Sequence, residues 1–288
     1  MTPGARSQPA RLVVCADDFG LNPQVNKGVL RLAATGRISA FSCLVDAPAA
    51  AAGAAELRGA HTRPADVGLH LNLKEAFEGA RLHLRHRELI ARTYSGLVDR
   101  DLLRAEIRRQ LDRFEALFDG IPDHVDSHLH VHQLRWVRDL LLAELADRYL
   151  RRLPWVRIGV PPASVSLLGD FSTDQWKAKA IGLLRADAFT AKAARSGFAM
   201  NRHLLGVYPF QDTSAAYLQR LARWVAQTVD GDLLLCHPAA SPGRADPLAV
   251  ARAVEYRVLA GTGFADVLAS ECVQVVRMAQ VQEACVTA

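Results

Sequence analysis

The stretch that decides the fold is Arg11–Gly20, which reads R-L-V-V-C-A-D-D-F-G. Its first part, Leu12–Ala16, is a short apolar run of the kind that forms a buried strand. Two adjacent carboxylates, Asp17 and Asp18, follow at once. Two acids at the end of a buried strand are costly unless a metal ion or a shared proton compensates them. The stretch therefore predicts a core strand and the first part of a polar site at its end.

The rest of the chain alternates strand-like apolar runs with helical patterns. Strands are predicted at 11–16, 38–45, 66–71, 123–127, 155–160, 232–236 and 272–277. Helices are predicted at 23–35, 47–59, 100–119, 134–150, 174–195, 214–229 and 247–260. This alternation implies right-handed crossovers and a parallel sheet. About seven repeats over this length favour an α/β fold that closes as a TIM-like (β/α) barrel over an open sheet.

The length and composition predict one domain over residues 11–288, preceded by a disordered lead at 1–10. Of the 288 residues, 50% are hydrophobic, which is enough for a large core. The segment 72–98 lacks clear periodicity and is predicted as a loop insertion. No apolar run is long enough for a membrane span, and the polar N-terminus does not resemble an ordinary secretory signal.

The charge pattern indicates which binding partners to expect, and the cysteine pattern indicates the cellular compartment. The net charge of +5 comes from scattered basic residues that are not interleaved with aromatics, so nucleic-acid binding is not expected. The five cysteines are odd in number and unclustered, which favours a reducing cytoplasm. Cys15 and Cys236 lie in apolar strands, where inert buried thiols are common.

Further polar residues recur where predicted strands end. His70 lies near the end of 66–71, the run 124–132 reads H-V-D-S-H-L-H-V-H, and His237 follows 232–236. The C-terminal ends of barrel strands meet on one face, so these residues should form one site with the N-terminal acids. We expect the middle strand to end near His128, which makes His128 the best candidate ligand in that run. A single histidine beside a strand is also typical of a hydrogen-bonded core residue, and this alternative remains open for His70.

Four motifs together resemble the YdjC/ChbG/HpnK family of carbohydrate deacetylases. They are A-D-D-F-G-L at 16–21, G-L-H-L at 68–71, H-V-D-S-H-L-H-V-H at 124–132 and L-L-L-C-H-P at 233–238. The family is similar to NodB-type polysaccharide deacetylases, which are irregular (β/α) barrels with one divalent metal. The resemblance implies removal of acetyl groups from N-acetylated sugars or oligosaccharides. Because related proteins are often dimers, a homodimer is one expectation.

The resemblance also implies a role for each matched residue. Asp18, His70 and His128 would be the metal ligands, Asp17 the general base and His237 the general acid. Phe19, Asn72, Asp126, His130 and His132 are expected to contact the substrate. The chain departs from the family pattern in C-H-P-A, where relatives commonly have C-H-P-G, and in 195–210, which matches no signature.

The chemistry of the donor set is compatible with this resemblance and leaves the metal open. Two histidines and a carboxylate bind Zn²⁺ with one position free for water, and Mg²⁺ is an alternative that prefers more oxygen ligands. A non-haem Fe(II) oxygenase uses the same donors but usually has an all-β fold. A hydrolase of another amide or ester and an inactive sugar-binding module are the remaining alternatives.

Overall fold

The computed structural model describes residues 8–59, 63–162, 185–243 and 246–286. Its strands are β1 (Ala10–Phe19), β2 (Ala40–Cys43), β3 (Asp66–Leu71), β4 (His124–Ser127), β5 (Trp155–Val156), β6 (Leu204–Leu205), β7 (Asp232–Cys236) and β8 (Val273–Val275). They form one sheet in the order β5-β4-β3-β2-β1-β7-β6, and β8 also pairs with β1. Every pairing is parallel, which confirms the predicted α/β barrel class.

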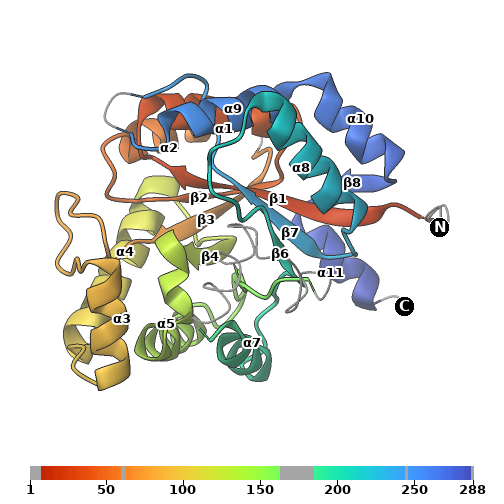
Figure 1. The fold of residues 1–288 in the computed structure, drawn as a ribbon. Helices are drawn as coiled ribbons and strands as arrows, with labels where there is room; N and C mark the ends of the chain where they lie inside the picture. Colours follow the sequence, from red (N-terminus) through yellow and green to blue (C-terminus); the bar gives the residue numbers. More distant parts are fainter. Residues whose placement is uncertain (1–7, 60–62, 163–184, 244–245, 287–288) are drawn as a thin grey trace.

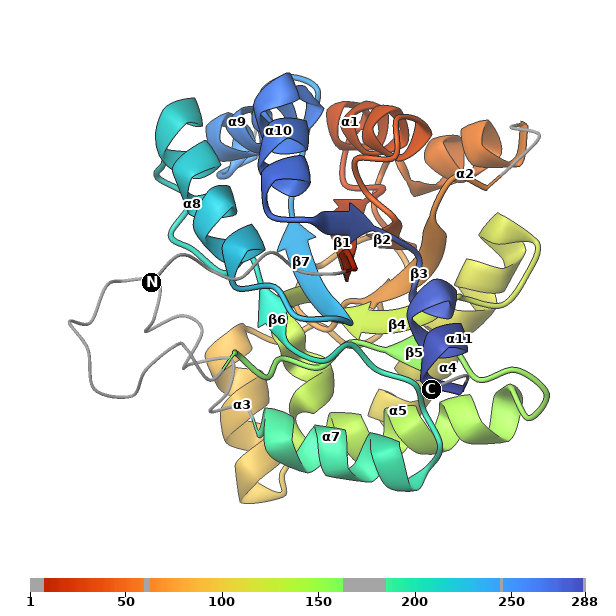
Figure 2. The ribbon, with the colours of Figure 1, turned by 90° about the vertical axis from the view of Figure 1, so that its right-hand side faces the viewer.

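Helices surround the curled sheet. They are α1 (Pro23–Ala34), α2 (Ala50–Gly59), α3 (His86–Ser95), α4 (Arg100–Phe118), the 3₁₀ segment η1 (His128–Gln133), α5 (Arg135–Arg148), α7 (Ala186–Arg195), α8 (Ser214–Ala226), α9 (Ala249–Ala260), α10 (Thr262–Ser270) and α11 (Met278–Val286). One group, α1, α2, α8, α9 and α10, lies on one side of the strands, and α3, α4, α5 and α7 lie on the other (Figure 1). Figure 2 shows the strands at the centre of this ring.

The barrel closes irregularly between its two edge strands, β5 and β6. Val156 forms a parallel bridge with Met200, and the Leu204 amide donates to the Val160 carbonyl at 2.8 Å. The segments 156–160 and 199–204 therefore join the edges of the sheet without a long ladder. No helix among the described residues is long and apolar enough to cross a membrane.

The structure differs from the sequence prediction mainly in short elements. The strand predicted at 155–160 is only two residues long in β5, and β6 was not predicted because two residues carry no periodicity. The predicted loop insertion at 72–98 contains α3, and α10 and α11 were also missed. The helix predicted at 174–195 lies partly outside the described residues, and its described part contains α7.

Candidate active site

The end of β1 brings both acids to one side of the barrel. In a regular strand, Asp17 and Asp18 would point to opposite faces. The register between β1 and β2 shifts between Ala16 and Phe19, and Asp18 adopts a φ of 65°. Aspartate tolerates this left-handed conformation better than most residues do. Because of this bulge, both carboxylates lie within 3.9 Å of the Nε2 atom of His70.

Asp18, His70 and His128 form a compact set of donor atoms. Asp18 Oδ1 lies 3.3 Å from His128 Nδ1 and 3.5 Å from His70 Nε2. One ligand atom from each residue lies within 4.8 Å of the other two. Asp18 and His70 are buried, and His128 is half-buried. Two imidazoles and one carboxylate at these separations fit a single divalent cation between them.

Neighbouring charges favour the ionised form of Asp18. Burial alone would raise the pKa of Asp18, but Arg252, which donates to its Oδ2 at 2.6 Å, and His128 hold that pKa well below its usual value. Burial would lower the pKa of His128, but the neighbouring carboxylates of Asp18, at 3.3 Å, and Glu75, at 3.7 Å, raise it to about 9. A cation at this site would therefore have to displace a proton from His128.

Asp17 has a different environment, dominated by a buried arginine. Arg157 is fully buried and donates to both oxygens of Asp17, at 2.7 and 2.9 Å. The same guanidinium lies 3.1 Å from Asp126, whose other oxygen is 2.6 Å from His70 Nδ1. Arg157 therefore holds the Asp17 carboxylate in one orientation. It also links Asp17 to Asp126, the carboxylate that bonds His70.

His237 approaches Asp17 from the end of β7. Its Nε2 lies 3.9 Å from Asp17 Oδ2, and its ring packs edge-on against Phe210 with centroids 5.1 Å apart. Its backbone amide donates to Glu255, which also accepts a hydrogen bond of 2.6 Å from the Tyr208 hydroxyl. Burial lowers the pKa of His237 to about 4 and raises that of Glu255 to about 7. His237 is therefore a neutral imidazole close to Asp17.

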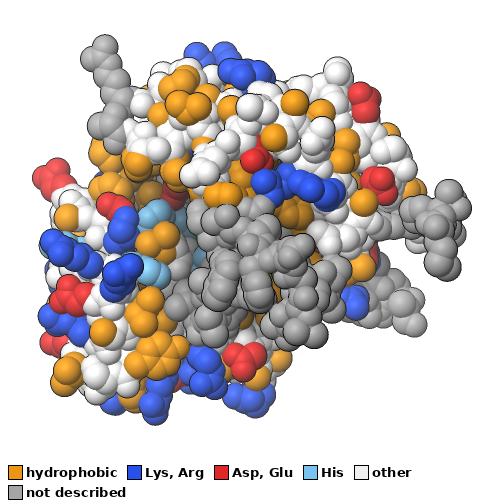
Figure 3. Space-filling model, in the orientation of Figure 1, with side chains coloured by type: hydrophobic (Ala, Val, Ile, Leu, Met, Phe, Trp, Pro, Cys, Tyr) orange, Lys and Arg blue, Asp and Glu red, His pale blue; other side chains and the backbone are white. Residues whose placement is uncertain are grey.

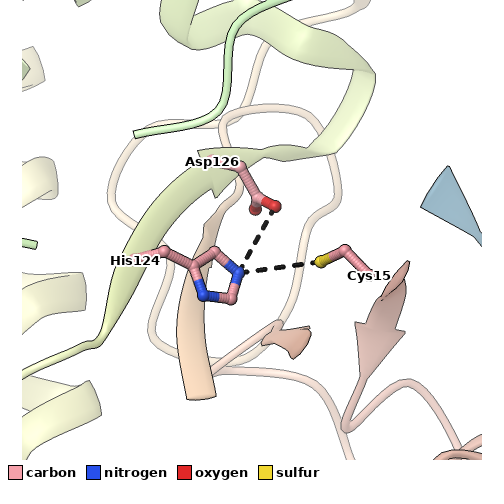
Figure 4. Close-up of side chains that lie close together, drawn as sticks. All are labelled: Cys15, His124 and Asp126. Atoms are coloured by element: carbon pink, nitrogen blue, oxygen red, sulfur yellow. Dashed lines mark hydrogen bonds and ion pairs between the residues drawn. The ribbon is translucent and has the colours of Figure 1, made fainter. Parts of the chain in front are cut away.

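A second buried cluster, of Cys15, His124 and Asp126, lies close to this site (Figure 4). His124 Nε2 is 3.8 Å from both Cys15 Sγ and Asp126 Oδ2, and its ring stacks on Trp155 with centroids 4.2 Å apart. Burial raises the pKa of Cys15 well above its usual value, so the group stays a thiol. Because Arg157 already compensates Asp126, the cluster is better explained as packing than as a cation site.

The site opens into a pocket of about 380 Å³. Its lining combines the polar centre with apolar side chains: Asp17, Asp18, His70, His86, Ile90, His128, Leu129, His130, Gly206, Val207, Tyr208, Phe210, Leu235, His237 and Leu248. Figure 3 shows histidines in a hollow of the surface beside hydrophobic side chains. A second pocket of about 520 Å³ shares Asp18 and His128 and adds Lys74, Glu75 and Arg252. The candidate metal site therefore borders both hollows, each of which combines charged and apolar side chains.

The remaining residues expected to contact the substrate occupy different positions. His130 lines the first pocket, whereas His132 is fully buried between Ser127 Oγ at 2.6 Å and the Arg157 carbonyl at 2.8 Å. Phe19 is buried against Phe41, with ring centroids 4.8 Å apart. Asn72 is buried and closes a turn, and Asp126 supports His70 as described above.

Sequence reasoning missed the residues that surround the predicted set. They are Glu75, Arg157, Tyr208, Phe210, Arg252 and Glu255. Arg157 did leave a signal, because it is a charged residue within a predicted apolar strand. Arg252 and Glu255 lie on a predicted helix, where charged residues are ordinary and point to no site.

Comparisons with known proteins agree with the motifs. The family described as "YdjC-like protein" matches residues 11–270. The chain is 37% identical over 162 residues to a carbohydrate deacetylase of Mus musculus, and this match covers 50% of each chain. It is 30% identical over 235 residues to a chitooligosaccharide deacetylase of Serratia marcescens, with 79% of this chain and 81% of the relative covered.

The alignment with the animal relatives thus spans about half of their length. Among solved structures, the chain resembles a protein of Enterococcus faecalis V583 whose description proposes cellobiose-phosphate cleavage. The TM-score is 0.69 at 18% identity, with 95% of this chain and 99% of that chain covered. At this identity the likeness shows a shared fold.

Proposed function

The chain belongs to the YdjC-like family, and from this premise we propose that it is a metal-dependent carbohydrate deacetylase. It would remove an acetyl group, or a similar acyl group, from an N-acetylated sugar or a related amide. The observation that carries the proposal is the donor set of Asp18, His70 and His128, with Asp17 and His237 beside it. Relatives named carbohydrate deacetylase and chitooligosaccharide deacetylase support the substrate class.

Asp18, His70 and His128 would hold one Zn²⁺ or Mg²⁺ ion. When bound, such an ion polarises an amide carbonyl and lowers the pKa of water. The ionised state of Asp18, which Arg252 favours, suits it to a divalent cation. The Asp126 carboxylate behind His70 Nδ1 fixes the ring so that Nε2 faces Asp18.

Asp17 would act as the general base that takes a proton from the attacking water. Its two hydrogen bonds from Arg157 fix the carboxylate in one orientation. The amine that leaves must be protonated, because an amide anion is a very poor leaving group. His237 would be the general acid, since it is neutral and lies 3.9 Å from Asp17. Closing of this gap in the substrate complex would let the proton that Asp17 accepts reach the amine through His237. Hydrolysis then yields a carboxylic acid and a free amine.

The segment 72–98 would contact the substrate, as a lid over the sugar. His86 and Ile90 from α3 line the first pocket, and Lys74, Glu75 and Phe77 line the second. Both hollows thus contain side chains from this segment, which supports a role in substrate recognition. The arginines of the segment would favour an anionic group on the substrate.

Metal analysis and acetate release together test the proposed function. Purified protein should contain about one divalent ion per chain and release acetate from N-acetylated sugars, and a chelator should abolish the release. Oxygen consumption with an α-keto acid, and no acetate release, would instead favour an Fe(II) oxygenase.

The enzyme would lie in the cytoplasm, where its four described cysteines, all free thiols, would stay reduced.

A further inference from the structure

Each of the two candidate histidine ligands has a carboxylate behind it. His70 directs Nε2 toward Asp18, and its Nδ1 lies 2.6 Å from Asp126 Oδ1. His128 directs Nδ1 toward Asp18, and its Nε2 lies 3.7 Å from Glu75 Oε1. A carboxylate on the second nitrogen of a metal-binding histidine fixes the ring and raises its basicity. Glu75 therefore faces the second ring nitrogen of His128 as Asp126 faces that of His70, but at an ion-pair distance rather than in a hydrogen bond.

The two supporting carboxylates differ in their surroundings. Asp126 lies on β4, is fully buried and is tied to Arg157. Glu75 lies on the segment that follows β3, and its side chain is 38% exposed. The core therefore fixes His70, whereas a surface segment supports His128.

This segment is built to hold Glu75 in place. Asn72 Oδ1 accepts hydrogen bonds from the amides of Lys74 and Glu75, at 3.0 and 2.9 Å, and Asn72 Nδ2 donates to the Glu75 carbonyl at 2.9 Å. Gln110 on α4 bonds both the amide and the carbonyl of Asn72, at 2.9 and 2.6 Å. The Lys74 ammonium pairs with the Glu75 carboxylate. The turn therefore sets the backbone position from which Glu75 reaches His128.

A second anchor holds the far part of the segment. The Arg81 amide donates to Glu106 on α4 at 3.1 Å, so the chain between Asn72 and Arg81 is attached to α4 at both ends. Between these anchors, Glu75 and Phe77 line the second pocket beside His128. We propose that Glu75 is a positioning residue that orients His128 for the metal and so couples the segment 72–81 to metal binding. This inference rests on the proposed metal site.

Zinc titration of chelator-stripped protein tests the inference without measuring turnover. After correction for the proton that Zn²⁺ displaces from His128, Glu75→Gln should weaken Zn²⁺ binding about 10–100-fold, because it removes the carboxylate behind His128. Isothermal titration calorimetry in buffers of different ionisation enthalpy measures both the affinity and the displaced proton. Glu78→Gln is the matched control, since Glu78 is an exposed glutamate of the same segment, and it should bind Zn²⁺ like the unchanged protein. Glu75→Asp keeps a carboxylate and should recover part of the affinity.

Hydrogen exchange of the segment provides a second readout. Zn²⁺ should slow amide exchange within 72–81 in the unchanged protein and in Glu78→Gln, but not in Glu75→Gln. Equal Zn²⁺ affinity of Glu75→Gln and the unchanged protein would overturn the role of Glu75 and leave the metal site intact. Absence of Zn²⁺ binding in the unchanged protein would instead contradict the metal site on which the proposed function depends.

Discussion

Replacing Asp17 by asparagine should lower turnover by about 10²–10⁴-fold and leave metal binding intact. Asparagine has nearly the shape of aspartate and can still accept one hydrogen bond from Arg157. It cannot take a proton from water, so the general base is lost. The expected loss corresponds to about 3–5 kcal/mol in the activation free energy.

The geometry explains why the metal should stay. Asp17 lies outside the set of Asp18, His70 and His128, and its nearest distance to His70 Nε2 is 3.9 Å. Arg157 would keep its contact of 3.1 Å with Asp126, so the buried guanidinium would still have an ionised partner. The metal content of Asp17→Asn should therefore match that of the unchanged protein.

The assay compares kcat for acetate release with metal content in the same preparations. Asp126→Asn is the informative second variant, because Asp126 is the other carboxylate held by Arg157. Near-normal turnover of Asp17→Asn, together with an inactive but metal-loaded Asp126→Asn, would refute the assignment of the base and favour Asp126.

Three further predictions concern pH and substrate contact. Because the pKa of His128 is raised to about 9, the Zn²⁺ affinity should fall about tenfold for each pH unit below 9. A Zn²⁺ affinity that calorimetry finds constant from pH 6 to 8 would contradict this. Burial lowers the pKa of His132 to about 4, so its contribution to folding is present above about pH 6.5 and is lost as the pH falls toward 4. The unchanged protein should lose about 3 kcal/mol more than His132→Gln over that window in urea unfolding, and equal losses would contradict the buried neutral state. Ile90→Ala should raise KM about fivefold at unchanged metal content, because it removes ~1 kcal/mol of apolar contact with the substrate. An unchanged KM would show that α3 does not contact the substrate.

The barrel and the centre of the site could be predicted from the sequence because both depend on local patterns. The apolar run before Asp17 predicts a buried strand, and parallel strands bring His70 and His237 to the same end. The sequence also predicted that the middle strand ends near His128. In the structure β4 ends at Ser127, and η1 begins at His128.

The partners of these residues depend on packing between distant elements. Arg157 is 140 residues from Asp17, and Arg252 is 234 residues from Asp18, so no local pattern pairs them. The bulge at Asp18 could not be predicted from the sequence either. Glycine is the residue that usually indicates a left-handed backbone conformation, and here an aspartate adopts it. Helix α3 was missed because charged residues crowd the start of its segment and mask the apolar period.

Metal content of two single variants tests the central claim most directly. The account predicts about one divalent ion per chain in the purified protein, and loss of both the ion and acetate release in His70→Ala and in His128→Ala. Elemental analysis by mass spectrometry, with circular dichroism to verify folding, provides the measurement. Full metal occupancy in both folded variants would contradict the site of Asp18, His70 and His128.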